Sequence, residues 1–156
     1  MYVSGYRDPE LLALSDKICT GLQYANMWQD VGADFTERGR IYLPQDEMRR
    51  FGVTETQIQV GEFTPAYREL LRDLTGRTRV LFAAGRPIEN RVDSDLASTL
   101  RLFRCGGEAI LDAIEAIDFN TLNKRPIVTR ATRLGLLSGT LINRLAAALR
   151  YKGVTA

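Results

Sequence analysis

Residues 23–34 read Gln-Tyr-Ala-Asn-Met-Trp-Gln-Asp-Val-Gly-Ala-Asp, and residues 38–44 continue with Arg-Gly-Arg-Ile-Tyr-Leu-Pro. The first stretch contains four polar side chains that are three, four and four residues apart: Gln23, Asn26, Asp30 and Asp34. Because an α-helix has about 3.6 residues per turn, this spacing places all four within a quarter of its circumference. The stretch therefore predicts a helix with one polar, acidic face, followed by a basic loop.

Two carboxylates on this face, those of Asp30 and Asp34, are one helical turn apart. They repel each other by about 0.2–0.5 kcal/mol, and a divalent cation between them would reverse the sign. Mg²⁺ commonly takes one or two carboxylates, several waters and the oxygens of a substrate phosphate. The guanidinium groups of Arg38 and Arg40 in the loop offer forked donors to the same phosphates. The segment therefore predicts a site for a magnesium-bound phosphate.

A solvated helix face is the alternative interpretation of the same spacing. Two further acid pairs in this chain are four residues apart, Glu69/Asp73 and Glu108/Asp112, and most pairs of this kind simply face water. The presence of Gln23 and Asn26 on the same helix face favours a metal site. These neutral hydrogen-bonding side chains stand where an amphipathic core stripe would place leucine.

The pattern resembles the second aspartate-rich motif of the squalene/phytoene synthase family, in the residues Gln23-x-x-Asn26-x-Trp28-Gln29-Asp30-Val31-x-x-Asp34 and Arg38-Gly39-Arg40-x-Tyr42-Leu43-Pro44. A weaker resemblance extends it over nearly the whole chain, through Phe103-Arg104-x-Gly106-Gly107-x-Ala109-Ile110-Leu111-Asp112. Trp28-Gln29 before the first aspartate is most similar to the bacterial hopanoid-pathway branch, the hydroxysqualene (squalene) synthases. The phytoene and presqualene-diphosphate branches more usually carry arginine at the position of Gln29.

The resemblance implies an all-α fold, an isoprenoid (terpenoid) synthase-like helical array. It also implies catalytic roles for five residues. Asp30 and Asp34 would bind Mg²⁺ bridged to a prenyl diphosphate. Gln23 and Asn26 would lie on the same wall, near the reacting carbons, and Tyr42 would lie at the edge of the site.

Substrate binding is implied for three more residues. Arg38 and Arg40 would contact the diphosphate, and Phe103 would lie beside the isoprenoid chain. The implied chemistry is ionisation of a prenyl diphosphate such as presqualene diphosphate, giving hydroxysqualene or squalene and free diphosphate in hopanoid or isoprenoid biosynthesis. Water ends the reaction in the hydroxysqualene branch. A hydride from NADPH is the alternative, and although the sequence has no dinucleotide fingerprint, reductive relatives lack one too.

Two alternatives stay open at this point. One is head-to-head prenyl condensation, as in phytoene or presqualene-diphosphate synthases. The other is an inactive fragment or interaction module, because family members carry a first aspartate-rich motif on an earlier helix. Asp8 and Asp16 are eight residues apart and do not replace it. We therefore expect one domain over residues 1–156 that corresponds to the C-terminal part of a synthase and is incomplete at its N-terminus. Its expected partners are a second copy of itself or the missing N-terminal part.

Composition excludes several other classes. The chain contains no histidine, which rules out histidine general bases, Ser-His-Asp triads and histidine-ligated zinc. Its two cysteines, Cys19 and Cys105, have no metal-ligand spacing and are expected to be buried free thiols in a reducing compartment. No signal peptide is visible, and residues 134–149 form an apolar stretch too short to span a bilayer. We expect a cytoplasmic protein.

Charge is uneven along the chain. Residues 1–118 carry a net charge of −5, whereas residues 119–156 carry +7 and no acidic residue. Such a basic segment fits either peripheral contact with the inner face of an anionic membrane or the solvated rim of a helix, and we favour the rim. Nucleic acid is not expected as a partner, because aromatic side chains are not interleaved with these arginines.

Every regular element that the pattern predicts is helical. The expected helices cover residues 9–35, 45–51, a short turn capped by Thr54, 65–85, 96–117 and a last helix capped by Thr129. Trp28 is expected to pack against a neighbouring helix, because it projects away from the acidic face.

The helix over 96–117 is predicted to pack through residues that alternate four and three apart: Leu96, Leu100, Phe103, Gly107, Ile110, Ile114 and Ile117. Gly106 and Gly107 lie in its middle and lower its helix propensity by about 1–2 kcal/mol relative to alanine. A close helix crossing or kink explains such glycines. Room for an isoprenoid chain beside Phe103 explains them equally well.

Overall fold

A computed structural model describes residue 1 and residues 4–128 of the chain, and every regular element in that part is helical. The elements are α1 (Pro9–Gln29), α2 (Val31–Arg38), α3 (Gln45–Phe51), α4 (Glu55–Gln59), α5 (Pro65–Gly85), the 3₁₀ helix η2 (Arg86–Asn90) and α6 (Ser94–Ala116). The all-α prediction is confirmed. The helix expected after Thr129 lies outside the described residues.

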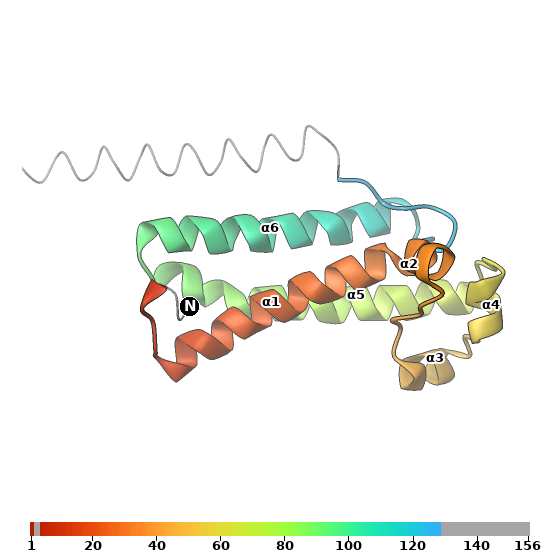
Figure 1. Cartoon of the computed structure of the whole chain (residues 1–156), viewed down its shortest axis with the longest axis horizontal. Helices are drawn as coiled ribbons and strands as arrows, with labels where there is room; N and C mark the ends of the chain where they lie inside the picture. Colours follow the sequence, from red (N-terminus) through yellow and green to blue (C-terminus); the bar gives the residue numbers. More distant parts are fainter. Residues whose placement is uncertain (2–3, 129–156) are drawn as a thin grey trace, which may run out of the picture.

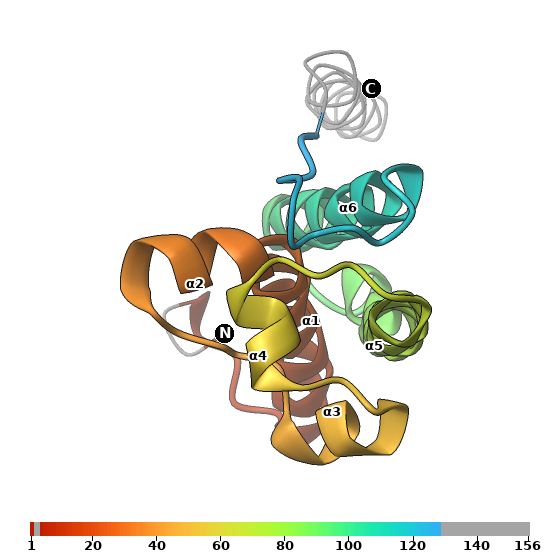
Figure 2. The ribbon, with the colours of Figure 1, turned by 90° about the vertical axis from the view of Figure 1, so that its right-hand side faces the viewer.

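Three long helices form the body of the molecule. Figures 1 and 2 show α1, α5 and α6 side by side, and each packs against the other two. In Figure 1, α5 runs in the opposite direction to α1 and α6, and the short helices α2, α3 and α4 gather at the end where α1 finishes. No helix in the described part of the chain is both long and apolar enough to cross a membrane.

The helix ends follow the capping signals in the sequence. The Asp8 carboxylate accepts a hydrogen bond of 2.9 Å from the Glu10 backbone N–H at the start of α1. Thr54 and Gln57 form the expected capping box on α4. Gly52 ends α3 with φ of 72°, a conformation that glycine adopts without strain. Local side-chain chemistry therefore fixes most of the boundaries.

One helix boundary differs from the prediction. The helix expected over residues 9–35 is interrupted at Asp30, whose backbone (φ −104°, ψ 12°) ends α1 and begins α2. The cause is a contact distant in sequence: the Gly32 backbone N–H donates to the Thr121 carbonyl at 3.1 Å. A Cβ added to Gly32 would lie 2.2 Å from the Leu122 carbonyl oxygen. This close passage of two backbones requires glycine and redirects the helix.

The buried face of α6 also differs from the prediction. Phe103 is 51% exposed, and the buried stripe instead follows Leu100, Arg104, Gly107, Leu111 and Ile114. The predicted spacing was correct, but two predicted core residues were each one position too early. Arg104 is buried in place of Phe103, and Leu111 in place of Ile110. Arg104 is buried because its guanidinium pairs with Glu89 of η2 and, at 2.8 Å, with Glu108. A charged residue at a core position is tolerated when it is paired in this way.

Phe82 is the centre of the three-helix packing. Its fully buried ring lies between Gly21 of α1 and Gly107 of α6, where an added Cβ would come within 2.8 Å and 2.3 Å of ring carbons, respectively. The helix-crossing explanation therefore holds for Gly107. Trp28 is buried as predicted and donates from Nε1 to Thr78 Oγ1 of α5 at 2.9 Å.

The prediction of two buried thiols was wrong. Cys19 is exposed on α1 and Cys105 is half-buried on α6. Both belong to amphipathic helices, but each lies beside the buried stripe rather than on it, next to Ile18 and Arg104. Cysteine's usual preference for the interior did not decide their position here.

Candidate functional site

The acidic pair lies at the junction of α1 and α2. The Asp34 backbone N–H donates to the Asp30 carbonyl at 2.7 Å, so the two residues remain one turn apart despite the change of direction. The side chain of Asp34 is 12% exposed, whereas that of Asp30 is 26% exposed. The junction therefore presents two carboxylates of unequal burial on successive turns.

Each carboxylate is paired with an arginine. Arg125 donates two hydrogen bonds to the Asp30 carboxylate, from Nε to Oδ1 at 2.8 Å and from Nη2 to Oδ2 at 3.2 Å. Arg38, one turn further along α2, pairs with Asp34. The hydrogen bond to Asp30 raises the pKa of Arg125 above its ordinary value, so the guanidinium stays protonated. The site thus neutralises its own acidic charge with forked cations.

The structure leaves four other predicted site residues exposed: Gln23, Asn26, Arg40 and Tyr42. Gln23 and Asn26 are exposed on α1. Arg40 donates from Nη1 to the Tyr42 hydroxyl at 3.1 Å, and its backbone N–H donates to the Asp34 carbonyl at 3.3 Å. The loop after α2 is therefore tied to the acidic turn.

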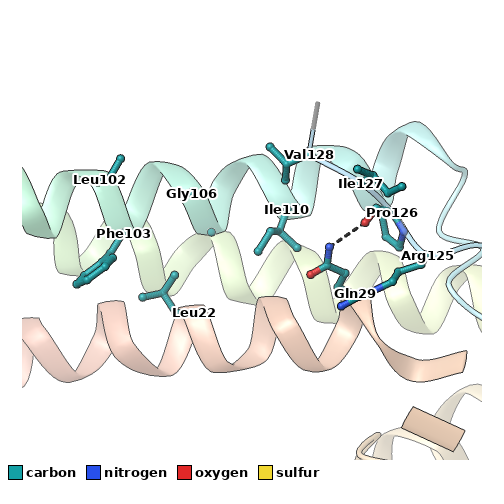
Figure 3. A pocket seen from close by; sticks show the side chains of 11 residues that line it. Leu22, Gln29, Leu102, Phe103, Gly106, Ile110, Arg125, Pro126, Ile127 and Val128 are labelled. Carbon is teal, nitrogen blue, oxygen red and sulfur yellow. Dashed lines mark hydrogen bonds between the residues drawn. The ribbon is translucent and has the colours of Figure 1, made fainter. Parts of the chain in front are cut away.

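A groove of about 600 Å³ extends from this junction between α1 and α6 (Figure 3). Gln29 and Arg125 lie at one end, and the Gln29 amide donates from Nε2 to the Pro126 carbonyl at 2.8 Å. Leu22, Phe103 and the glycines of α6 extend it away from the charged end. The volume of the groove is in the range of small-molecule sites, and the groove is polar at one end and apolar along the rest of its length.

Arg125 and its segment are the part of the site that the sequence patterns did not single out. The residue lies 95 positions from its partner Asp30, in the irregular chain after α6. One signal in the sequence could have found it: Lys124-Arg125-Pro126 is a basic pair before a proline, and it begins six residues after Asp118, the last acidic residue. Only the tertiary structure assigns it to the acidic turn.

The donor set at the junction fits a magnesium ion bound together with a phosphate. Within the described residues, no group of three or more His, Cys, Asp or Glu side chains could hold a metal. Two carboxylates are nevertheless sufficient where waters and phosphate oxygens complete the shell, as Mg²⁺ prefers. Asp30 and Asp34 supply oxygen ligands only, which is the correct chemistry for that ion.

The fold is similar to that of a solved bacterial enzyme. The squalene synthase HpnC from Alicyclobacillus acidocaldarius matches 76% of this chain with a TM-score of 0.73 and 40% sequence identity. That likeness identifies the helical array as an isoprenoid synthase fold. Phytoene synthase 2 from Oryza sativa subsp. japonica is 38% identical over 116 residues, 72% of this chain, and phytoene synthase 1 from Arabidopsis thaliana is 32% identical over 119 residues, 74% of this chain.

The squalene/phytoene synthase family model matches residues 1–132, and the chain belongs to that family. It spans less than half the length of these relatives: 44% of the squalene synthase, 28% of the rice protein and 27% of the Arabidopsis protein. The expected family and fold are thereby confirmed.

Proposed function

We propose that this chain carries the second aspartate-rich half of a prenyl-diphosphate site, in an enzyme that ionises presqualene diphosphate toward hydroxysqualene or squalene. The supporting observation is the combination at the α1–α2 junction: two arginine-paired carboxylates, one of them paired with Arg125, which also lines the charged end of an apolar groove. A prenyl diphosphate has the matching chemistry, an anionic head that needs cations and an apolar tail that needs burial.

Exchange of ion-pair partners is the central step of the proposed binding. Asp30 and Asp34 would hold Mg²⁺, which when bound would draw negative charge away from the departing diphosphate. Arg38 and Arg125 would leave the carboxylates and donate to phosphate oxygens. The Asp30–Arg125 pair is partly exposed, and such pairs contribute only about 0–1 kcal/mol, so its loss opposes this exchange weakly. Asp34 is buried, and the bound ion would replace the positive charge that Arg38 supplies to it. Arg40 is close enough in sequence to join them, directed by its contact with Tyr42.

The groove would serve the hydrocarbon part of the substrate. Leu22, Phe103 and Ile110 supply apolar surface, which would shield the carbocation from premature reaction with bulk water. Capture by water gives hydroxysqualene, and capture by hydride from NADPH gives squalene. Hopanoid biosynthesis is the setting we propose, supported by the 40% identity to the bacterial squalene synthase.

Head-to-head condensation of two prenyl diphosphates is the second candidate. It is favoured by the similarity to the plant phytoene synthases. Analysis of the products formed by the full-length enzyme separates the two: presqualene diphosphate consumed to give an alcohol or squalene supports the first candidate, and phytoene supports the second.

A non-catalytic role as an interaction module is the third candidate, supported by the exposure of two predicted site residues, Gln23 and Asn26. In that case these side chains would face a second polypeptide that completes the site. Light scattering measures the relevant quantity, the mass of the chain in solution. A dimer or larger species supports association, and a monomer opposes it.

The decisive experiment for the leading candidate is calorimetric titration of the chain with inorganic pyrophosphate, with Mg²⁺ or with EDTA. We expect binding only with Mg²⁺, weakened at least about tenfold by Asp34→Asn. Asp46→Asn is the matched control, because it also removes a carboxylate paired with an arginine on a helix, away from the junction. Equal affinity for Asp34→Asn and Asp46→Asn would overturn the proposal.

A further inference from the structure

The two adjacent glycines of α6 have different surroundings. A Cβ on Gly107 would collide with Phe82 at 2.3 Å, so packing alone requires glycine there. A Cβ on Gly106 would meet no described atom within 4 Å, yet Gly106 lines the groove. Glycine within a helix costs about 1 kcal/mol relative to alanine. At Gly106 that loss of stability has no packing explanation in the described part of the chain.

The position of Gly106 within the groove is specific. Figure 3 shows it between Phe103 and Ile110 on the face of α6 that looks toward α1, with Leu22 opposite. Residues at positions 103, 106 and 110 share one helix face by their spacing. Gly106 is therefore a gap in a row of apolar side chains, and the gap adds to the space between the two helices.

The groove has a direction as well as a volume. Gln29 and Leu22 are seven residues apart on α1, which corresponds to about 10 Å at 1.5 Å per residue. An isoprene unit contributes four bonds of about 1.5 Å at angles near 111°, and so spans about 5 Å. A chain that starts at the charged end therefore passes Gly106 within its first two isoprene units.

We infer that Gly106 is a specificity-determining residue, and that its missing side chain admits the isoprenoid chain to the groove between α1 and α6. This inference rests on the proposed function, because it takes the groove as the site of the prenyl tail. It predicts that any larger residue at 106 blocks the tail without affecting the diphosphate head. The charged contacts of Asp30 and Asp34 come from other elements and are unchanged.

The test compares Gly106→Leu with Gly76→Leu. Gly76 is also within a helix, and an added Cβ there would likewise meet no described atom within 4 Å, but it is exposed on α5 away from the groove. Binding of four probes is measured by calorimetry with Mg²⁺: inorganic pyrophosphate, geranyl diphosphate, farnesyl diphosphate and farnesol. We expect Gly106→Leu to weaken both farnesyl ligands about tenfold, since exclusion of two methylenes already has that effect. Pyrophosphate affinity should stay unchanged, and Gly76→Leu should match the parent chain throughout. Gly106→Ala should give an intermediate loss.

The probes separate failure of this inference from failure of the proposed function. Unchanged affinity of Gly106→Leu for both farnesyl ligands would overturn the inference even if pyrophosphate binds. Absence of pyrophosphate binding in the parent chain, with farnesol bound and then lost in Gly106→Leu, would overturn the diphosphate proposal and support the groove. Absence of binding by all four probes would overturn both. Melting curves confirm that each variant is folded before titration.

Discussion

Replacement of two adjacent glycines, Gly106 and Gly107, by alanine is expected to change the stability of the fold in opposite directions. Gly107→Ala places a Cβ 2.3 Å from one ring carbon of Phe82 and 3.0 Å from Leu22 Cδ2. Phe82 is fully buried, so its ring cannot swing into solvent. Overpacking of this kind costs about 1–3 kcal/mol, and the gain in helix propensity returns about 1 kcal/mol. Because the buried ring cannot move aside, we expect the upper part of that cost, about 2–3 kcal/mol, and therefore a net loss of about 1–2 kcal/mol.

Gly106→Ala is the matched change one residue away. The added methyl enters open space on the groove, so only the gain from a less flexible unfolded chain remains, about 0.4–1 kcal/mol. The two variants should therefore differ by about 2 kcal/mol. For a chain of this length, that corresponds to melting temperatures about 4–8 °C apart.

Thermal unfolding followed by circular dichroism at 222 nm, the standard wavelength for helix content, measures this difference, and urea titration gives it in free energy. The parent chain should melt between the two variants. Equal stability of the variants, or a higher melting temperature for Gly107→Ala than for Gly106→Ala, would refute the assignment of Gly107 to a tight helix crossing and of Gly106 to open space. Gly21→Ala, whose Cβ would lie 2.8 Å from a carbon of the same ring, serves as the second tight position and should resemble Gly107→Ala.

Three further predictions concern side chains with defined partners. Arg104→Leu leaves Glu89 buried without its cation and should lower the free energy of unfolding by about 3–5 kcal/mol. A loss of less than about 1 kcal/mol in a urea titration would mean that the ion pair is unimportant for stability. Trp28→Phe removes the hydrogen bond to Thr78 and part of a buried ring, so the free energy of unfolding should fall by about 1–3 kcal/mol. An unchanged midpoint of urea unfolding would deny that contact a structural role. Arg125→Gln removes an exposed ion pair and should change the free energy of unfolding by less than about 1 kcal/mol. The same variant should weaken Mg²⁺-dependent pyrophosphate binding several-fold. A calorimetric affinity equal to that of the parent chain would mean that Arg125 is not part of the site.

Helix starts and stops were predictable because local chemistry determines them. Asp8, Thr54 and Gly52 act on neighbouring backbone groups, and those groups are visible in the sequence. The interruption at Asp30 was not predictable, because it depends on Gly32 meeting the chain near Thr121, some 90 residues away. A periodic pattern cannot report contacts between segments that far apart.

The buried face of α6 shows a different limit of sequence patterns. Hydrophobicity favoured Phe103 over Arg104 as the core residue, yet Arg104 is buried because Glu89 and Glu108 neutralise it. The candidate site shows the same limit. Its acidic half could be read from helical spacing, whereas Arg125 joins it only through tertiary structure. Residues that act through distant partners are the ones that the sequence patterns missed.

The proposed site requires Asp30 and Asp34 to bind one magnesium ion together, and a double-mutant cycle tests this directly. Calorimetry with Mg²⁺ and inorganic pyrophosphate gives affinities for the parent chain, Asp30→Asn, Asp34→Asn and the double variant. Two ligands of one ion are coupled, so we expect the double variant to bind about as weakly as either single variant. Losses that simply add would mean that the two carboxylates act independently, and unchanged binding in all variants would mean that neither holds the ion.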